Sequence, residues 1–312
     1  MFLTVCLNPT LQKTLRFSSI FPDTVNRAGS HKLFVSGKGI NVTRVLTQLG
    51  KKAVHLTQLG GNFRQLFLSL CENDELCVEW IESNSQIRFC YTLLTANDNA
   101  VTELIEESDS VAHETEQLLM EKFNALLQTQ RFSILIISGT KAAGFSDNVF
   151  PMMAEKAKEK GIRIILDFRG NDLLNCLKHE PDIIKPNLFE FASTFAPELI
   201  KDNDILINDE KTKEKIKSAV MDISQKYRCS VILTNGSRNI FAADKNDFYQ
   251  IDVTPVKTVN SIGCGDAFTA GLASALEENM SASQPLNLKA AISEGIRCGA
   301  LNAGLEKPGV IK

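Results

Sequence analysis

The sequence predicts an α/β protein whose central, mostly parallel β-sheet is covered by helices on both faces. Apolar, β-rich runs alternate with amphipathic helical runs along most of the chain. Residues 133–138 (Ser-Ile-Leu-Ile-Ile-Ser) form a continuous apolar run, which is typical of a strand buried on both faces. Motifs that carry glycine and polar residues lie just after strands, where open α/β sheets bind their ligands.

The elements follow in order from the spacing of the apolar residues. We expect strands at residues 3–7, 53–59, 133–138, 162–167, 183–184 and 230–234. A first helix follows Lys38, because Val42, Val45 and Leu46 lie on one side and Gly50 closes it. Further helices are expected at about 113–129, 147–160, 210–227, 266–279 and 287–303. We expect residues 1–312 to form one domain, without a linker or an internal repeat.

Two segments, about 11–34 and 86–106, interrupt this alternation. They contain short alternating runs at residues 13–17, 88–94 and 100–105, with a turn signal at Asn97-Asp98-Asn99 between the last two. These patterns predict a small separate β-sheet that protrudes from the main domain. The alternative is an ordinary hairpin at the edge of the main sheet.

Composition excludes several classes of function. The 312 residues carry a net charge of −3, which argues against a nucleic-acid or membrane-surface partner. No apolar run approaches the length of a membrane span, and the N-terminus lacks the basic region of a signal peptide. The eight cysteines and four histidines are scattered without a zinc-binding spacing. Scattered cysteines fit a reducing compartment, and we expect a cytoplasmic protein.

The most informative segment is Ser261-Ile-Gly-Cys-Gly-Asp-Ala-Phe268, which opens a helix. Its two glycines let the backbone turn and present bare N–H groups, and amides at a helix N-terminus bind anions such as phosphate. Asp266 lies at the mouth of this pocket, where a carboxylate can take a proton from an attacking alcohol. The alternative is a helix-entry turn with an acidic residue in the first turn.

A second glycine motif, Ser36-Gly-Lys-Gly-Ile-Asn-Val42, also leads into a helix. Lys38 is a mobile positive charge beside free amides, and Asn41 offers both a donor and an acceptor to a ligand. The alternative is a surface turn with a solvated lysine. The spacing is neither that of a Walker A loop nor that of a dinucleotide-binding fingerprint.

The order of these and two other motifs resembles the PfkB family of ribokinase-like sugar kinases. The resemblance spans roughly residues 2–310 and is greatest to the branch of 1-phosphofructokinase and tagatose-6-phosphate kinase. The motifs that carry it are Leu7-Asn-Pro-Thr-Leu11, Gly37 to Leu46, Lys185-Pro-Asn187 with Glu190, and Gly263 to Phe268. It implies a three-layer α/β/α sandwich with a β-sheet lid that covers the sugar and often forms a dimer contact. It also implies ATP and Mg²⁺ as cofactors.

The resemblance assigns the ATP side of the site. Asp266 is the general base, and the amides of Gly263, Cys264 and Gly265 form the anion hole. Asn187 and Glu190 place Mg²⁺ through water, although their spacing also fits a helix-capping pair. Residues implied to contact ATP are Lys185, Asn187, Glu190, Thr234, Asn235, Gly236 and, at the adenine pocket, Gly299 and Asn302.

The acceptor side is implied to bind the sugar and its existing phosphate. Its expected residues are Gln12, Arg27, Gly37, Lys38, Gly39, Asn41, Arg88 and Ser138. Each arginine can instead be a solvated charge on the lid. Three positions depart from the family pattern: Gln12 stands in place of Asp, Ser36 in place of Gly, and Ser138-Gly-Thr-Lys141 in place of Ser-Gly-Ser-Leu-Pro.

The resulting hypothesis is ATP-dependent phosphorylation of a sugar phosphate, of the fructose 1-phosphate or tagatose 6-phosphate type. A homodimer through the lid is expected, with no nucleic-acid or membrane partner. Two alternatives stay open: a kinase of an unphosphorylated sugar or a nucleoside, and a non-catalytic protein that binds sugar phosphate or nucleotide.

Overall fold

The computed structural model describes the chain except for residues 98–99, 201–204, 206–209 and 282–286. A nine-stranded sheet in the order β13-β12-β11-β10-β9-β8-β1-β4-β5 forms its centre. All neighbours in it pair in parallel except the two pairs that involve β12. Its strands are β1 (Phe2–Leu7), β4 (Ala53–Gly60), β5 (Cys77–Ser83), β8 (Ile134–Lys141), β9 (Arg163–Asp167), β10 (Ile183–Ile184), β11 (Ser230–Thr234), β12 (Asn239–Ala243) and β13 (Phe248–Asp252).

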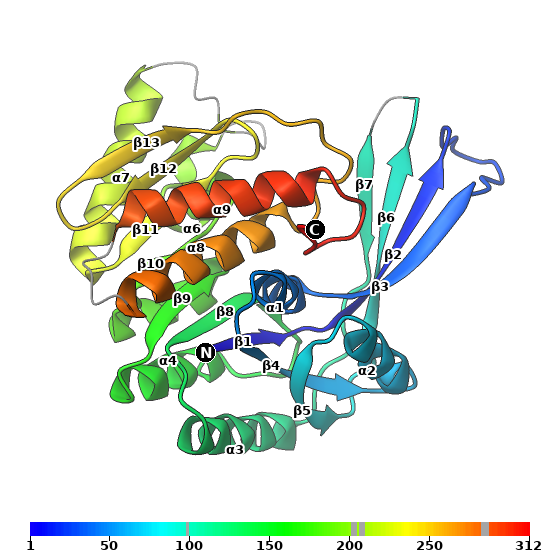
Figure 1. Cartoon of the computed structure of the whole chain (residues 1–312), viewed down its shortest axis with the longest axis horizontal. Helices are drawn as coiled ribbons and strands as arrows, with labels where there is room; N and C mark the ends of the chain where they lie inside the picture. The colour runs from blue at the N-terminus through cyan, green and yellow to red at the C-terminus, as the bar shows by residue number, and fades with distance from the viewer. Residues whose placement is uncertain (98–99, 201–204, 206–209, 282–286) are drawn as a thin grey trace.

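Helices cover both faces of this sheet, as predicted (Figure 1). One face packs on α1 (Lys38–Gln48), α8 (Cys264–Ser281) and α9 (Leu288–Ala303). The other packs on α3 (His113–Thr129), α4 (Val149–Glu159), α5 (Gly170–Cys176), α6 (Leu188–Phe195) and α7 (Glu210–Tyr227). Alternate residues of β8 pack on opposite faces of the sheet. Ile134 and Ile136 pack in the cluster that contains α8, whereas Leu135 and Ile137 pack in the opposite layer. The three-layer α/β/α architecture is therefore confirmed.

A separate four-stranded sheet projects from one side of the molecule (Figure 1). It consists of β3 (Ser30–Ser36), β2 (Thr10–Phe17), β6 (Arg88–Thr95) and β7 (Val101–Ile105), in that order. Its strands come from the two segments in which the sequence interrupts the α/β alternation, and in the described part of the chain none of them pairs with the main sheet. We call this sheet the lid. Of the expected turn at 97–99, Asp98 and Asn99 lie outside the described residues.

The structure contains several elements that the sequence analysis did not predict. The antiparallel hairpin of β12 and β13 extends one edge of the main sheet, and β5 forms the other edge. The helix α2 (Arg64–Asn73) packs with Leu11 and Val35 of the lid in a third apolar cluster. Short 3₁₀ turns lie at Leu177–His179 and Pro197–Leu199.

Two expectations from composition can be compared with the structure. All eight cysteines carry free thiols. Among the described residues, no helix has the length and apolar character needed to cross a membrane.

Candidate active site

A cavity of about 790 Å³ lies between the lid and the main domain. Its walls come from β2, β6 and β7 of the lid, from the start of α1, and from the turn that opens α8. The cavity brings together most of the predicted site residues. Those that line it are Gln12, Gly37, Lys38, Asn41, Arg88, Lys185, Asn187, Glu190, Thr234, Gly236, Gly263, Cys264, Gly265, Asp266 and Gly299.

The turn before α8 presents backbone amides to the cavity. Gly263 has φ +84, and a Cβ atom there would lie 2.8 Å from the backbone nitrogen of Gly309. A Cβ on Gly265 would meet no atom within 4 Å, because that position faces open space. The Cys264 amide already donates to the Ser261 carbonyl at 3.3 Å. Among the described residues, no backbone acceptor pairs with the amides of Gly263, Gly265 or Asp266, as expected for a helix start. The open amides are therefore those of Gly263, Gly265 and Asp266, so Asp266 replaces Cys264 in the predicted set.

The carboxyl group of Asp266 lies beside these amides and is only 6% exposed. Its Oδ2 accepts a hydrogen bond from Asn41 Nδ2 at 2.8 Å. Burial raises the pKa of Asp266 to about 6, although Lys38 and the Asn41 hydrogen bond oppose this shift. A carboxyl group with a pKa near neutrality can accept a proton and release it again at physiological pH.

A buried carboxylate that sequence reasoning missed, Asp167, joins both lysines of the site. Its Oδ1 lies 3.2 Å from Lys185 Nζ and 3.6 Å from Lys38 Nζ, and its Oδ2 accepts from Ser138 and Thr269. Burial alone would raise the pKa of Asp167, but the two lysines outweigh it and hold that pKa below its usual value. The signal in the sequence that could have identified Asp167 is its place as an acidic residue at the carboxyl end of an otherwise apolar strand.

Lys38 differs from Lys185 in its freedom to meet a ligand. Lys185 is 3% exposed, whereas the Lys38 side chain is 39% exposed. The pairs of Lys38 with Asp167 and Glu190 are long, at 3.6 and 3.7 Å. Asp167, helped by Glu190, outweighs burial and raises the pKa of Lys38, so the ammonium group stays charged. Of the two lysines, Lys38 is therefore the one exposed to an incoming anion.

Asn187 and Glu190 form the capping box that the sequence offered as the alternative to a metal site. Asn187 Oδ1 accepts from the Glu190 amide at 2.7 Å, and Glu190 Oε2 accepts from the Asn187 amide at 2.8 Å. Within the described residues no group of three or more His, Cys, Asp or Glu side chains could enclose a metal. The cap leaves Glu190 Oε1 facing Lys38 at 3.7 Å. One carboxylate oxygen with water fits Mg²⁺ that is also held by substrate phosphates.

The remaining predicted residues lie outside the cavity. Arg27 is exposed on the loop between β2 and β3, and Asn235 pairs with Asn239 beside the hairpin. Gly39 packs against Cys6 and His55, where a Cβ would approach to 2.7 Å. The buried Asn302 donates to the carbonyls of Lys307 and Val310 and so anchors the C-terminal segment.

On the acceptor side, Gln12 donates its amide to the Thr92 hydroxyl within the lid. Arg88 donates to Thr10 Oγ1 at 3.2 Å and to the Glu106 carbonyl at 3.1 Å. Its Nη2 atom has no protein acceptor among the described residues. Glu103 of β7, a carboxylate absent from the predicted set, also lines this wall.

A parallel sheet with a β-sheet lid, open amides at a helix start and a buried carboxylate beside them define the class of ribokinase-like small-molecule kinases. The pattern of the pfkB family of carbohydrate kinases matches residues 5–308. The chain therefore belongs to the pfkB family of carbohydrate kinases, which are ATP-dependent enzymes.

Solved structures share this fold. Phosphofructokinase-2 from Escherichia coli in complex with fructose-6-phosphate is 19% identical, with a TM-score of 0.81 over 97% of this chain and 93% of that chain. A possible 1-phosphofructokinase from Thermotoga maritima is 16% identical, with a TM-score of 0.80 over 97% of this chain and 91% of that chain. At these identities the likeness establishes the fold.

The two glycines of the turn before α8 have different requirements. Gly263→Ala should lower the free energy of unfolding by about 1–3 kcal/mol, because it strains a positive φ and meets backbone atoms. Gly265→Ala should keep stability within about 1 kcal/mol, since its Cβ meets only open space. It should nevertheless lower kcat by about 10²-fold by displacing the phosphoryl group. Urea unfolding and ADP release measure the two effects. Wild-type kcat in Gly265→Ala would show that no phosphoryl group approaches this turn.

Proposed function

We propose that this protein transfers the γ-phosphoryl group of ATP to a hydroxyl group of a sugar phosphate, with fructose 1-phosphate and tagatose 6-phosphate as the first acceptors to test. The observation that carries the proposal is the placement of Asp266. Its buried carboxylate lies next to amides that are open to a cavity large enough for both substrates. This pairing of a base with an anion site suits phosphoryl transfer to an alcohol.

In the proposed step, the sugar hydroxyl oxygen attacks the γ-phosphorus of ATP. The new oxygen–phosphorus bond forms as the bond from phosphorus to the β,γ-bridging oxygen breaks, and ADP leaves. The hydroxyl proton passes to the free Oδ1 of Asp266. The open amides of Gly263 and Gly265 stabilise the negative charge on the migrating group.

Charged side chains around this point complete the proposed site. Lys38 is placed to leave its long ion pairs and contact a phosphoryl oxygen. Asp167 holds Lys185 in position through an ion pair of 3.2 Å. Glu190, through Oε1 and water, is the residue that would hold Mg²⁺, with Asn187 shaping the same helix start. When bound, Mg²⁺ supplies positive charge that offsets the charge of the phosphates.

The guanidinium group of Arg88 on the lid supports a phosphorylated acceptor. Arg88 lines the cavity. Its Nη2 has no acceptor among the described residues, so it can donate to a ligand. A guanidinium group that is held by two hydrogen bonds is well suited to bind a phosphate with its remaining donors. Lys38 lines the same cavity and, in the proposed complex, contacts the migrating phosphoryl group.

Replacing the proposed base should abolish turnover without loss of the fold. Asp266→Asn keeps the shape of the side chain but cannot accept the proton, so kcat should fall by about 10²–10⁴-fold or more. ADP release should be measured with fructose 1-phosphate, tagatose 6-phosphate, the free sugars and a nucleoside. ATP binding by calorimetry and the unfolding midpoint serve as controls and should match the wild type.

The same panel separates the alternatives. Turnover of a free sugar or a nucleoside, with none of any phosphosugar, would contradict the proposed acceptor class. Binding of sugar phosphate and ATP without any ADP release would instead identify a non-catalytic binding protein.

Arg88 tests recognition of the existing phosphate. Arg88→Ala should raise KM for the phosphosugar by about 10–10²-fold, because it removes a charged hydrogen bond worth about 1.5–3 kcal/mol. KM for ATP and any turnover of the free sugar should stay unchanged. Arg131→Ala, at an exposed arginine that does not line the cavity, is the matched control. An equal loss for phosphorylated and free sugars would favour the unphosphorylated acceptor.

We also propose that two copies associate through the lid. Apolar side chains are exposed on the lid and its β2–β3 loop, with Val25 81% and Phe21 62% exposed. Arg27 lies on the same loop, so its predicted contact with a substrate requires a partner copy or a lid movement. Val25→Asp should convert a dimer to a monomer in sedimentation velocity. Leu118→Asp on α3, also at an exposed apolar residue, should not. A monomeric wild type would contradict the proposal.

A further inference from the structure

Arg44 is a buried charge that the proposed reaction does not use. It lies one turn after Asn41 on α1 and is only 3% exposed. Nη1 donates to Asn41 Oδ1 and to the Pro308 carbonyl, both at 2.9 Å. Nη2 donates to the Val35 carbonyl at 2.6 Å, and Nε donates to Asp74 Oδ2 at 2.9 Å. The guanidinium group is therefore held by four separate parts of the chain.

These contacts determine how the Asn41 amide is oriented. The two ends of an asparagine side chain differ only in hydrogen bonding, since one accepts and the other donates. A guanidinium group has donors only, so it selects the oxygen end, and the Ser36 hydroxyl also donates to that oxygen at 3.3 Å. The nitrogen end then faces Asp266, to whose Oδ2 it donates at 2.8 Å.

We propose that Arg44 is a positioning residue for phosphoryl transfer: it fixes the Asn41 amide with its nitrogen toward Asp266, which keeps that carboxylate ionised and leaves Oδ1 free for the acceptor hydroxyl. This inference rests on the proposed role of Asp266 as the base. Without Arg44 the amide could rotate and present its oxygen. Two oxygens at 2.8 Å tolerate each other only when the carboxyl group carries a proton, and a protonated Asp266 is no longer a base.

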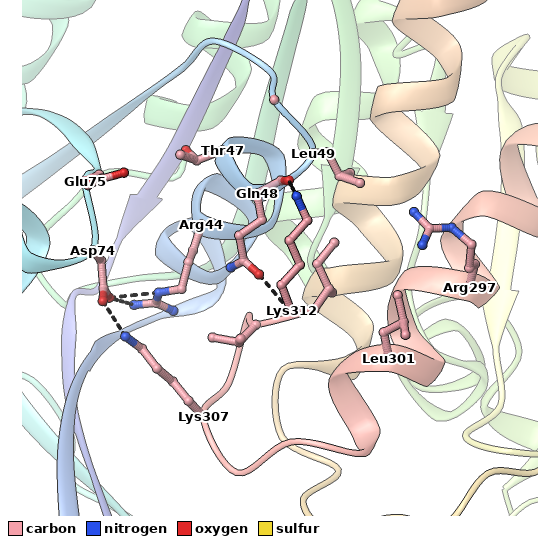
Figure 2. Close-up of a pocket in the computed structure, with 13 residues that line it drawn as sticks. Arg44, Thr47, Gln48, Leu49, Asp74, Glu75, Arg297, Leu301, Lys307 and Lys312 are labelled. Carbon is pink, nitrogen blue, oxygen red and sulfur yellow. Dashed lines mark hydrogen bonds and ion pairs between the residues drawn. The ribbon is translucent and has the colours of Figure 1, made fainter.

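The C-terminal segment, residues 304–312, keeps Arg44 in place. Figure 2 shows the hollow beside it, in which Asp74 pairs with both Arg44 and Lys307. Gln48, one turn after Arg44, donates to the Gly309 carbonyl and accepts from the Ile311 amide. At Gly309, φ is +69, and a Cβ would lie 2.7 Å from Asn41 Cα. The segment thus presses directly on the helix turn that carries Asn41.

Other groups also influence ionisation of Asp266. Lys38 and Lys185 favour the carboxylate, whereas Asp167 and burial favour the protonated acid. The charged and titratable groups that face Asp266 are Lys38, Arg44, Asp167, Lys185 and the thiols of Cys6 and Cys264. Because the groups other than Arg44 are unchanged in an Arg44 variant, a shift in the pKa of Asp266 reports the loss of the guanidinium group and of the amide orientation that it selects.

The experiment compares Arg44→Met with Gln48→Met in the full chain. Both variants loosen the C-terminal segment, but only the first releases the Asn41 amide. The wild-type rate should fall as pH drops through about 6, where Asp266 gains a proton. In Arg44→Met this acid limb of kcat should move up by about one pH unit or more. In Gln48→Met it should stay in place. The same pH midpoint for the acid limb of kcat in both variants would overturn the proposal and leave Arg44 a structural residue.

A measurement on the wild type covers the case in which Arg44→Met does not fold. In ¹⁵N- and ¹³C-labelled protein, the Asn41 side-chain amide signals should titrate with the same midpoint as the Asp266 carboxyl carbon. An Asn41 signal that ignores this titration would overturn the proposal. This readout needs no turnover, so it stands apart from the proposed function. If Asp266→Asn is inactive but the acid limb of kcat in Arg44→Met matches that of the wild type, only the proposed role of Arg44 fails.

Discussion

The site depends on one hydrogen bond, from Asn41 Nδ2 to Asp266 Oδ2, which joins residues 225 positions apart. It connects the first turns of α1 and α8, the two helices that open with the glycine motifs. An ionised carboxylate buried to this degree is costly unless donors and cations surround it. Asn41 supplies the donor, and Lys38 and Lys185 supply the positive charge. The close packing of Gly263 and Gly309 lets the two helix starts approach.

The charges of the site form an arrangement that an incoming phosphate can rearrange. Asp167 forms ion pairs with two lysines through Oδ1 and accepts from two hydroxyl groups through Oδ2, so it is a fixed centre of negative charge. Lys185 is buried against it and is equally fixed. Lys38 is held at longer range and is partly exposed, which makes it the adjustable member. Under the proposed function, such a site keeps the base and its anchoring charges in place while the Lys38 ammonium group adjusts to the ligand.

The sequence predicted this fold well because periodicity and turn residues report local structure. The alternation of strands and helices, the interrupted segments of the lid and the two glycine turns are all local signals. The sequence could not reveal that Asp167 lies between Lys38 and Lys185, or that Arg44 reaches Pro308 across 264 residues. Such contacts depend on how distant elements pack. Arg27 and Arg88 look alike in sequence, yet only Arg88 lines the cavity.

The departures from the family pattern take on a physical meaning in this setting. The hydroxyl of Ser36 is a second donor to Asn41 Oδ1, so it reinforces the amide orientation that Arg44 selects. Gln12 uses its amide within the lid, on Thr92. A carboxylate that lines the cavity from the lid is Glu103 on β7. The hydrogen bonds around Asp266 thus stay in place with Ser36 and Gln12 present, and Glu103 adds a carboxylate to the lid wall of the cavity. Under the proposed function, acceptor choice falls to the lid, and phosphoryl transfer falls to the junction of α1 and α8.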